Sequence, residues 1–236
     1  MRAFPLAAAW LISAAAITAQ PVPDRHAAAR FLGRPVTITE PALDADGFFP
    51  KGPASLCLEG PPRRQCYKAE EEFGRFPRAE IVEISRGTSA LLFSVASGGV
   101  SGWRVHFALL RPGPDETLED LFLSDTTVSN QSEHKFIRQP GISASPIFVT
   151  ADYVLGMDEG HYGEHRYIIS AYLWRRSLEH NGSFYTLADR FMTVRKYESI
   201  DQPDVIERER REILARLRRV VGARSPRPKP RPPVAR

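Results

Sequence analysis

Short hydrophobic runs separated by turn-forming residues dominate the chain between residues 35 and 200. The runs are rich in Val, Ile, Phe, Tyr and Thr, and clusters of Gly, Pro, Asn and Asp interrupt them about every 8 to 15 residues. This spacing is typical of short β-strands joined by turns. The clearest predicted strands cover residues 80–85, 89–96, 102–110, 146–153, 165–175 and 183–197.

The alternation within residues 102–110 predicts which of these side chains are buried. Every second position is large and apolar, namely Trp103, Val105, Phe107 and Leu109. Arg104 and His106 fall on the opposite face, which is the pattern of a half-buried strand. Gly98-Gly99 before this strand and Asn181-Gly182 before the last strand each predict an antiparallel hairpin.

Two helices are predicted at the ends of this β region. The longer covers residues 203–221, with Asp201 or Gln202 as its cap and Gly222 as its end. Its apolar stripe consists of Val205, Ile206, Ile213, Leu214, Leu217, Val220 and Val221. A short helix is predicted over residues 25–32, capped by Asp24 and ended by Gly33. We therefore predict a mainly β fold, an antiparallel β-sandwich or a barrel-like sheet, with one C-terminal α-helix packed on it.

The first nineteen residues have the pattern of an export signal. Arg2 provides a short basic start, residues 3–17 are apolar, and Ala19 is a small residue that suits cleavage before Gln20. An N-terminal helix of the mature protein is the alternative, but this segment has no polar face to turn toward water. We therefore predict residues 1–19 as a signal peptide and a periplasmic or extracellular location for the mature chain.

Size and cysteine content fit one domain in an oxidising compartment. The chain has 236 residues, 42% of them hydrophobic, which is enough for one good-sized core. We predict a single β-rich domain over residues 20–221. Cys57 and Cys66 are the two cysteines, and we predict that they form a disulfide. Two cysteines alone do not complete a zinc site, and their spacing is wider than that of Cys-x-x-Cys redox motifs.

The formal net charge of +4 is unevenly distributed. Residues 20–221 hold 26 basic against 28 acidic side chains, a net charge of −2, whereas residues 222–236 hold five basic side chains and no acid. A slightly acidic core argues against a nucleic-acid partner. We predict residues 222–236 to be a disordered Pro/Arg-rich basic tail, either simply solvated or bound to an anionic surface such as phospholipid headgroups, lipopolysaccharide or a wall polymer.

One stretch has a composition suited to chemistry. His161, Glu164 and His165 form the sequence His-x-x-Glu-His, which matches the motif of inverzincin zinc peptidases, and Asp158 lies close by. In that chemistry the histidines bind zinc and the glutamate is the general base. The motif needs a helix, but glycines interrupt it here and β-forming residues follow. On an extended strand the two histidines would lie about 13 Å apart.

Three function classes follow from these observations. The first is an exported, non-enzymatic binding or interaction module of the cell envelope or extracellular space, without a cofactor, whose partner is an unknown protein or an envelope polymer. The alternative is a metal-dependent hydrolase with His161, His165 and Asp158 as ligands of Zn or Ca and Glu164 as general base. A polar loop with ordinary surface hydrogen bonds explains the same stretch, and we favour that interpretation because no third ligand can be placed from the sequence. A purely structural domain of a larger assembly is the third reading.

Overall fold

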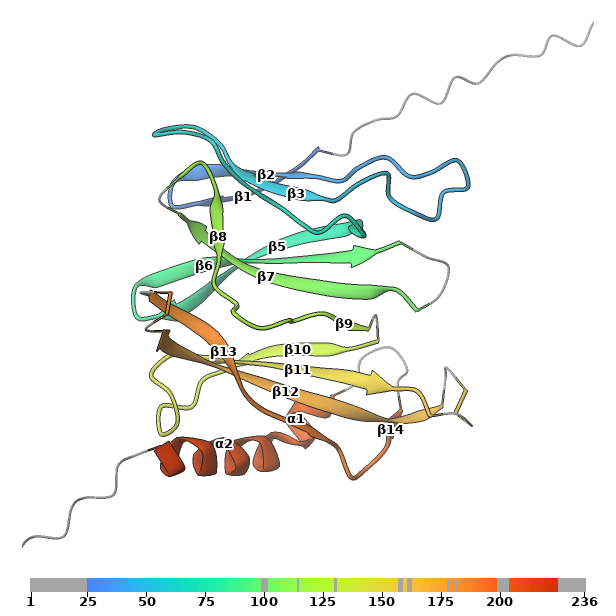
Figure 1. Cartoon of the computed structure of the whole chain (residues 1–236), viewed down its shortest axis with the longest axis vertical. Coiled ribbons are helices and arrows are strands. Elements are labelled where there is room, and N and C mark those ends of the chain that lie inside the picture. The colour runs from blue at the N-terminus through green and yellow to red at the C-terminus, as the bar shows by residue number, and fades with distance from the viewer. Residues whose placement is uncertain are drawn as a thin grey trace, which may run out of the picture.

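Three antiparallel sheets lie one above another, with a helix beneath the last sheet (Figure 1). The computed structural model describes residues 25–98, 102–113, 115–129, 131–156, 159–160, 163–177, 179–180, 182–198 and 204–224. The predicted signal peptide lies outside these residues. The predicted mainly β sandwich with a C-terminal helix is confirmed.

Each sheet is built from consecutive segments of the chain. The N-terminal sheet contains β1 (Arg25–Phe31), β2 (Arg34–Thr39), β3 (Ser55–Leu58) and β4 (Gln65–Lys68), in that order. The middle sheet has the order β5 (Phe73–Ser85), β6 (Thr88–Ser97), β7 (Arg104–Pro112) and β8 (Leu118–Asp120), and β9 (Val128–Ser129) also pairs with β7. The C-terminal sheet has the order β10 (Glu133–Ile137), β11 (Ile147–Val154), β12 (Glu164–Ser177) and β13 (Gly182–Met192), and β14 (Tyr197–Glu198) pairs with β12. The helices are α1 (Val205–Arg208) and α2 (Arg210–Arg224).

Three hydrophobic clusters fill the spaces between these layers. One joins the N-terminal and middle sheets and includes Leu56 and Phe93. A second, rich in aromatic rings, joins the middle and C-terminal sheets and includes Phe107 and Phe148. The third joins the C-terminal sheet to the helices and includes Ile169. The middle and C-terminal sheets are therefore covered on both faces.

The N-terminal sheet covers part of the face of β7 that the sequence predicts to be polar. Trp103, Val105 and Phe107 do share a face of β7, and this face looks toward the C-terminal sheet. On the opposite face Arg104 is exposed, as the alternation predicts, but Ala108 is buried and His106 lies under the N-terminal sheet. The His106 ring lies 3.3 Å from the Tyr67 hydroxyl, measured from Nε2. The neighbouring strand β6 is likewise buried on both faces, and its nearly continuous apolar run over residues 90–96 is typical of such a strand.

The predicted helix over residues 25–32 is wrong, because this segment forms β1. It pairs antiparallel with β2, and Leu32-Gly33 makes the turn between them. Both turn residues have positive φ, 50° and 75°, as a two-residue hairpin of the type I′ class requires. The pairing partner is distant from the local capping signals, so the helix prediction did not include it.

The C-terminal helix begins and ends later than predicted. Asp204 is the N-cap residue of α1, while residues 201–203 lie outside the described part. The Glu133 carboxylate from β10 accepts a hydrogen bond from the Ile206 N–H at 3.0 Å, so a neighbouring strand caps the helix. A turn at Glu209 separates α1 from α2, and α2 continues past Gly222 to Arg224. Gly222 is exposed and is not in the left-handed conformation that ends helices, so it is tolerated there.

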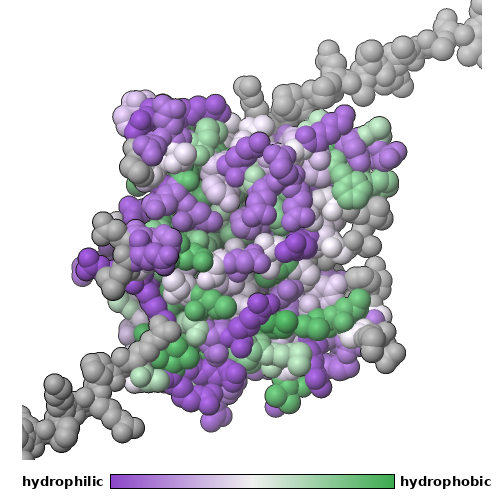
Figure 2. All heavy atoms as spheres, in the orientation of Figure 1, coloured by the Kyte–Doolittle hydropathy of each residue, from purple (hydrophilic) through white to green (hydrophobic). Residues whose placement is uncertain are grey.

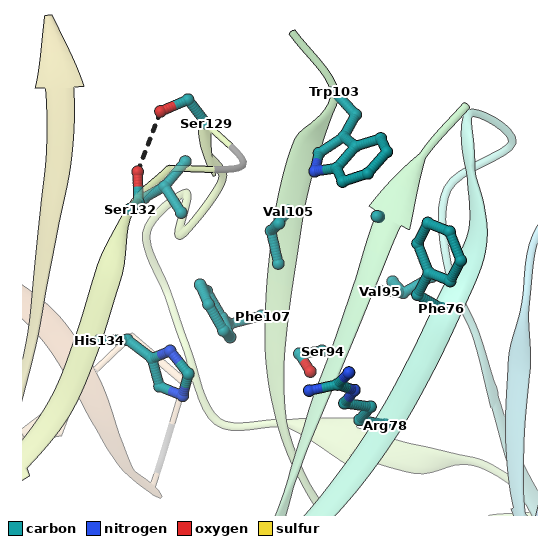
Figure 3. A pocket seen from close by; sticks show the side chains of 12 residues that line it. Phe76, Arg78, Ser94, Val95, Trp103, Val105, Phe107, Ser129, Ser132 and His134 are labelled. Carbon is teal, nitrogen blue, oxygen red and sulfur yellow. Dashed lines mark hydrogen bonds between the residues drawn. The ribbon is translucent and has the colours of Figure 1, made fainter. Parts of the chain in front are cut away.

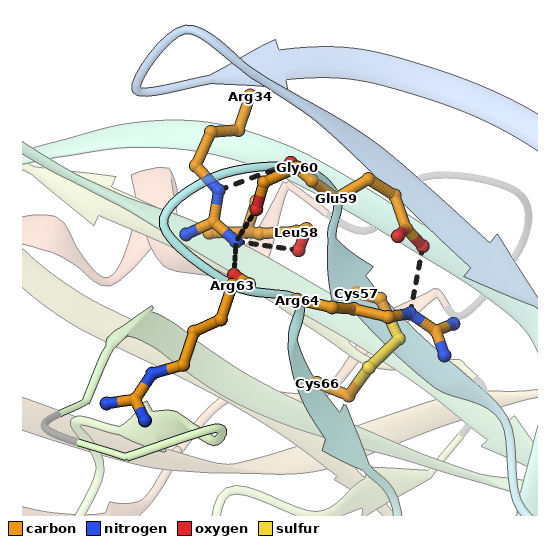
Figure 4. Close-up of a disulfide and its surroundings, with 8 residues drawn as sticks. All are labelled: Arg34, Cys57, Leu58, Glu59, Gly60, Arg63, Arg64 and Cys66. Atoms are coloured by element: carbon orange, nitrogen blue, oxygen red, sulfur yellow. Dashed lines mark hydrogen bonds and ion pairs between the residues drawn. A yellow bond between two sulfur atoms is a disulfide. The ribbon is translucent and has the colours of Figure 1, made fainter.

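The predicted Cys57–Cys66 disulfide is present and joins paired residues of β3 and β4 (Figure 4). The Arg34 side chain from β2 spans the loop that this bond closes. Its guanidinium donates to the Leu58 carbonyl at 2.8 Å and to Oε1 of Gln65 at 2.7 Å. The small hairpin is thus fixed by a covalent bond and by one arginine. Such a bond persists in oxidising compartments.

No helix among the described residues has the length and hydrophobicity to cross a membrane.

Candidate binding groove

A groove of about 290 Å³ opens where the middle sheet and strand β10 diverge (Figure 3). Its floor consists of Val105 and Phe107 on one face of β7 and of Trp103, which directly precedes β7. One wall comes from β5 and β6, and the other from β9, Ser132 and His134. The groove lies beside the aromatic cluster between the two sheets, at a place where side chains no longer fill the space.

An irregular stretch of β5 shapes the first wall. In the first half of β5 the pairing with β6 shifts register twice, between Phe73 and Arg75 and again between Arg75 and Arg78. Within this stretch Phe76 has a φ of 50°, a left-handed conformation that costs about 1 to 3 kcal/mol for a residue other than glycine. The Phe76 N–H donates to the Glu40 carboxylate at 3.1 Å, which helps to hold this conformation. The result is a large aromatic side chain that remains 47% exposed at the mouth of the groove.

Phe76 and Trp103 form an aromatic pair at this mouth. Their ring centroids are 5.5 Å apart with an interplanar angle of 62°, an edge-to-face arrangement. The Arg75 guanidinium lies 4.6 Å from the centroid of the Phe76 ring and adds a cation–π contact. Two elements that are distant in sequence therefore present one partly exposed apolar surface.

His134 and Arg78 supply the polar groups at the other end of the groove (Figure 3). The His134 ring lies 4.5 Å from the ring of Phe107, and burial lowers its pKa, against a smaller opposing effect of Glu80. The imidazole is therefore neutral at pH 7. The Arg78 side chain is exposed, and its guanidinium has no hydrogen bond or ion pair to any residue that the structure describes.

Two serines beside His134 are bound to a carboxylate and not to the imidazole. One oxygen of Asp152 accepts hydrogen bonds from the Ser129 N–H at 2.9 Å and from the Ser132 hydroxyl at 2.8 Å. The Ser129 hydroxyl also donates to this oxygen, and the two hydroxyl oxygens are 3.0 Å apart. This arrangement ties β9 to the C-terminal sheet. It does not resemble a nucleophile with a histidine base, because neither serine donates to His134.

The surface around these elements is mixed. On the face shown in Figure 2, hydrophobic atoms gather mainly over the C-terminal sheet and hydrophilic atoms dominate elsewhere. The large apolar side chains left exposed near that sheet are Leu155, Leu187, Met192 and Val194.

The structure separates two residues of the predicted metal motif. Glu164 and His165 are adjacent in β12, so their side chains point to opposite faces of the strand, and Glu164 is exposed while His165 is fully buried. Asp158 and His161 lie outside the described residues. A strand at Glu164–His165 does not provide the helical face that the zinc-peptidase motif requires.

His165 belongs instead to a local ion-pair cluster. Its Nδ1 lies 3.1 Å from the Glu159 carboxylate, which also accepts a hydrogen bond from the Gly156 N–H at 2.9 Å and pairs with Lys196 at 2.5 Å. The bonds from Lys196, Gly156 and His165 lower the pKa of Glu159 to about 2. The described residues contain no group of three or more His, Cys, Asp or Glu side chains arranged to hold a metal ion. The metal alternative stays a prediction, since two of its ligands are not described.

Comparison of the chain with protein-family models, with curated protein sequences and with solved structures gave no match. Interpretation of the site thus depends on its residues. Sequence reasoning missed the groove, although Trp103 had been singled out as a core residue. Phe76-Pro77-Arg78 within an otherwise extended run was the available signal, since proline in a strand indicates an edge or a bulge.

Proposed function

We propose that this protein is an exported binding module that holds a small ligand in the groove between Phe76, Trp103 and His134. The observation that carries the proposal is the Phe76 bulge. A strained backbone conformation is kept where it positions a large, half-exposed aromatic ring against a second aromatic ring.

The composition of the groove supports binding over catalysis. Small-molecule sites are concave and mostly apolar, with a few polar groups that fix orientation, and their volumes begin near 300 Å³. The groove has an aromatic mouth, an apolar floor, one arginine and one neutral histidine. Its serines donate to Asp152, so the lining includes no activated nucleophile among the described residues.

Export is part of the same proposal. The Cys57–Cys66 disulfide supports an oxidising environment, and the first nineteen residues supply the signal that would lead there. Periplasm and extracellular space both satisfy these conditions.

Nuclear magnetic resonance on the isotope-labelled mature chain, residues 20–236, tests the proposal with a library of small fragments. Binders are expected to shift backbone signals of residues 76–78, 94–96, 103–107 and 128–134. Phe76→Ala should abolish these shifts. Ile81→Ala is the matched control, because Ile81 lies on the same strand with a similar exposure of 49% but does not line the groove.

Fragments that bind elsewhere, or that bind Phe76→Ala as well as the native protein, would overturn the proposal. Pulldown from envelope fractions tests whether a macromolecular partner binds at the groove. If a partner is captured equally by the native protein and by Phe76→Ala, the groove is not the binding surface.

A further inference from the structure

We infer that the ligand of the groove is a small free carboxylate that carries an apolar ring. The ring would lie against Phe76 and Trp103, and the carboxylate would bind the Arg78 guanidinium. This inference rests on the proposed function and specifies the ligand class.

The charged side chains around the groove indicate the charge of the ligand. Arg78 is the one charged side chain among the described residues that line the groove, because His134 is neutral. The carboxylates of Glu40 and Glu80 lie in an adjoining hollow that Phe76 and Arg78 also line, but neither carboxylate forms an ion pair with Arg78. An arginine without an acidic partner beside an apolar floor is complementary to an anion, and a planar carboxylate matches its donors in pairs.

Hydrogen-bonding groups near Arg78 also favour this end of the groove as the binding site of the carboxylate. Figure 3 shows the Arg78 guanidinium beside the Ser94 hydroxyl, with His134 on the opposite wall. Arg78 and Ser94 are paired positions of β5 and β6, so this placement is fixed by the sheet. A hydroxyl and a neutral imidazole can each donate one hydrogen bond to a carboxylate oxygen.

The apolar end of the groove, formed by Phe76 and Trp103, indicates that the ligand carries a ring. Trp103 and Phe76 meet in an edge-to-face arrangement, and Figure 3 shows both rings at the same end of the groove. Aromatic faces of this kind favour another ring over a flexible alkyl chain, because an aromatic pair gains energy beyond the area it buries.

The dimensions limit the size of the ligand. Phe107 in β7 and Trp103, directly before β7, are four residues apart, so the floor is about 13 Å long in extended backbone. A volume of about 290 Å³ is at the lower end of ligand sites, which suits a ring joined to a carboxylate by a short linker. This is the reason to assign a free small molecule and not a protein chain.

Trp103 itself provides the measurement. The mature chain retains Trp103 and Trp174, so Trp174→Phe leaves Trp103 as the reporter of fluorescence. We would titrate this protein with 3-phenylpropionate and with its neutral amide. The acid is expected to bind with a dissociation constant on the order of 1 mM, as fits its small size. The amide should bind about five- to tenfold more weakly.

Substitutions then assign the charge selectivity to Arg78. Arg78→Gln should weaken binding of the acid to the level of the amide and leave the amide unchanged. Arg86→Gln removes an equal charge from the exposed turn between β5 and β6 and should change neither. If Trp174→Phe does not fold, the indole N–H signal of Trp103 in labelled native protein gives the same titration.

Each outcome decides one point. Equal binding of acid and amide, both lost in Phe76→Ala, would refute the carboxylate class while the proposed function stands. If neither 3-phenylpropionate nor its amide changes the Trp103 fluorescence, the carboxylate class is also refuted. The fragment screen then shows whether the groove binds any small molecule. Much tighter binding of a dipeptide that ends in phenylalanine would show that the occupant is a chain terminus and would contradict the assignment to a free small molecule.

Discussion

Phe148→Ala is expected to destabilise the protein strongly, because Phe148 is the centre of the layer that joins the middle and C-terminal sheets. Its ring is fully buried and has centroid distances of 5.8 Å to Phe107, 4.9 Å to Phe122, 5.0 Å to Phe136 and 5.8 Å to Tyr172. Truncation removes this burial and leaves a cavity that two sheets cannot close without moving. Substitutions of this kind cost about 3 to 5 kcal/mol.

That loss is a large fraction of the stability of a typical domain, which is about 5 to 15 kcal/mol. Urea unfolding of the mature chain, followed by near-ultraviolet circular dichroism, measures it as a lower midpoint with an unchanged slope. Leu187→Ala on β13 of the same sheet is the control, because Leu187 is exposed, and its cost should stay below about 0.5 kcal/mol. A loss below about 1 kcal/mol for Phe148→Ala would refute the reasoning that this layer holds the two sheets together.

Three further predictions concern the disulfide, pH and export. Replacing Cys57 and Cys66 together by serine should lower the free energy of unfolding by about 2 to 3 kcal/mol, measured by thermal unfolding against the native protein under oxidising conditions. Burial raises the pKa of Asp120 to about 6, so its folded form holds a proton more tightly than the unfolded form does. Stability from this group is therefore complete below about pH 4 and is lost as the pH rises to about 6, and Asp120→Asn should remove that part of the pH dependence in urea titrations. An unchanged pH profile in Asp120→Asn would contradict this. Mass spectrometry of the exported protein should find Gln20 as its first residue, and a mature chain that retains Ala19 and the residues before it would contradict the predicted signal.

Local patterns predicted the elements that depend on local physics. The hairpins at Gly98 and Gly182, the strands β6, β7, β11 and β12, and the apolar stripe of the C-terminal helices follow from turn residues and periodicity. The single strand predicted over residues 183–197 is instead two strands, β13 and β14. The disulfide followed from composition, since two cysteines in a chain predicted to be exported have one pairing available. These predictions needed no knowledge of which layer covers which face.

The errors concern contacts between segments that are distant in sequence. Residues 25–31 form a strand and not the predicted helix because β2 pairs with them, and His106 is covered because the N-terminal sheet packs over it. The groove also depends on a contact between residues that are distant in sequence. Phe76 and Trp103 are 27 positions apart, and two register shifts in β5 bring their rings together, which periodicity does not reveal.

The most direct test of the account is a crystal structure of the mature protein soaked with 3-phenylpropionate. We predict electron density in the groove, with the phenyl ring against Phe76 and Trp103 and the carboxylate within hydrogen-bond distance of the Arg78 guanidinium. A groove that stays empty while the compound binds elsewhere, or a compound bound with its carboxylate away from Arg78, would contradict the account.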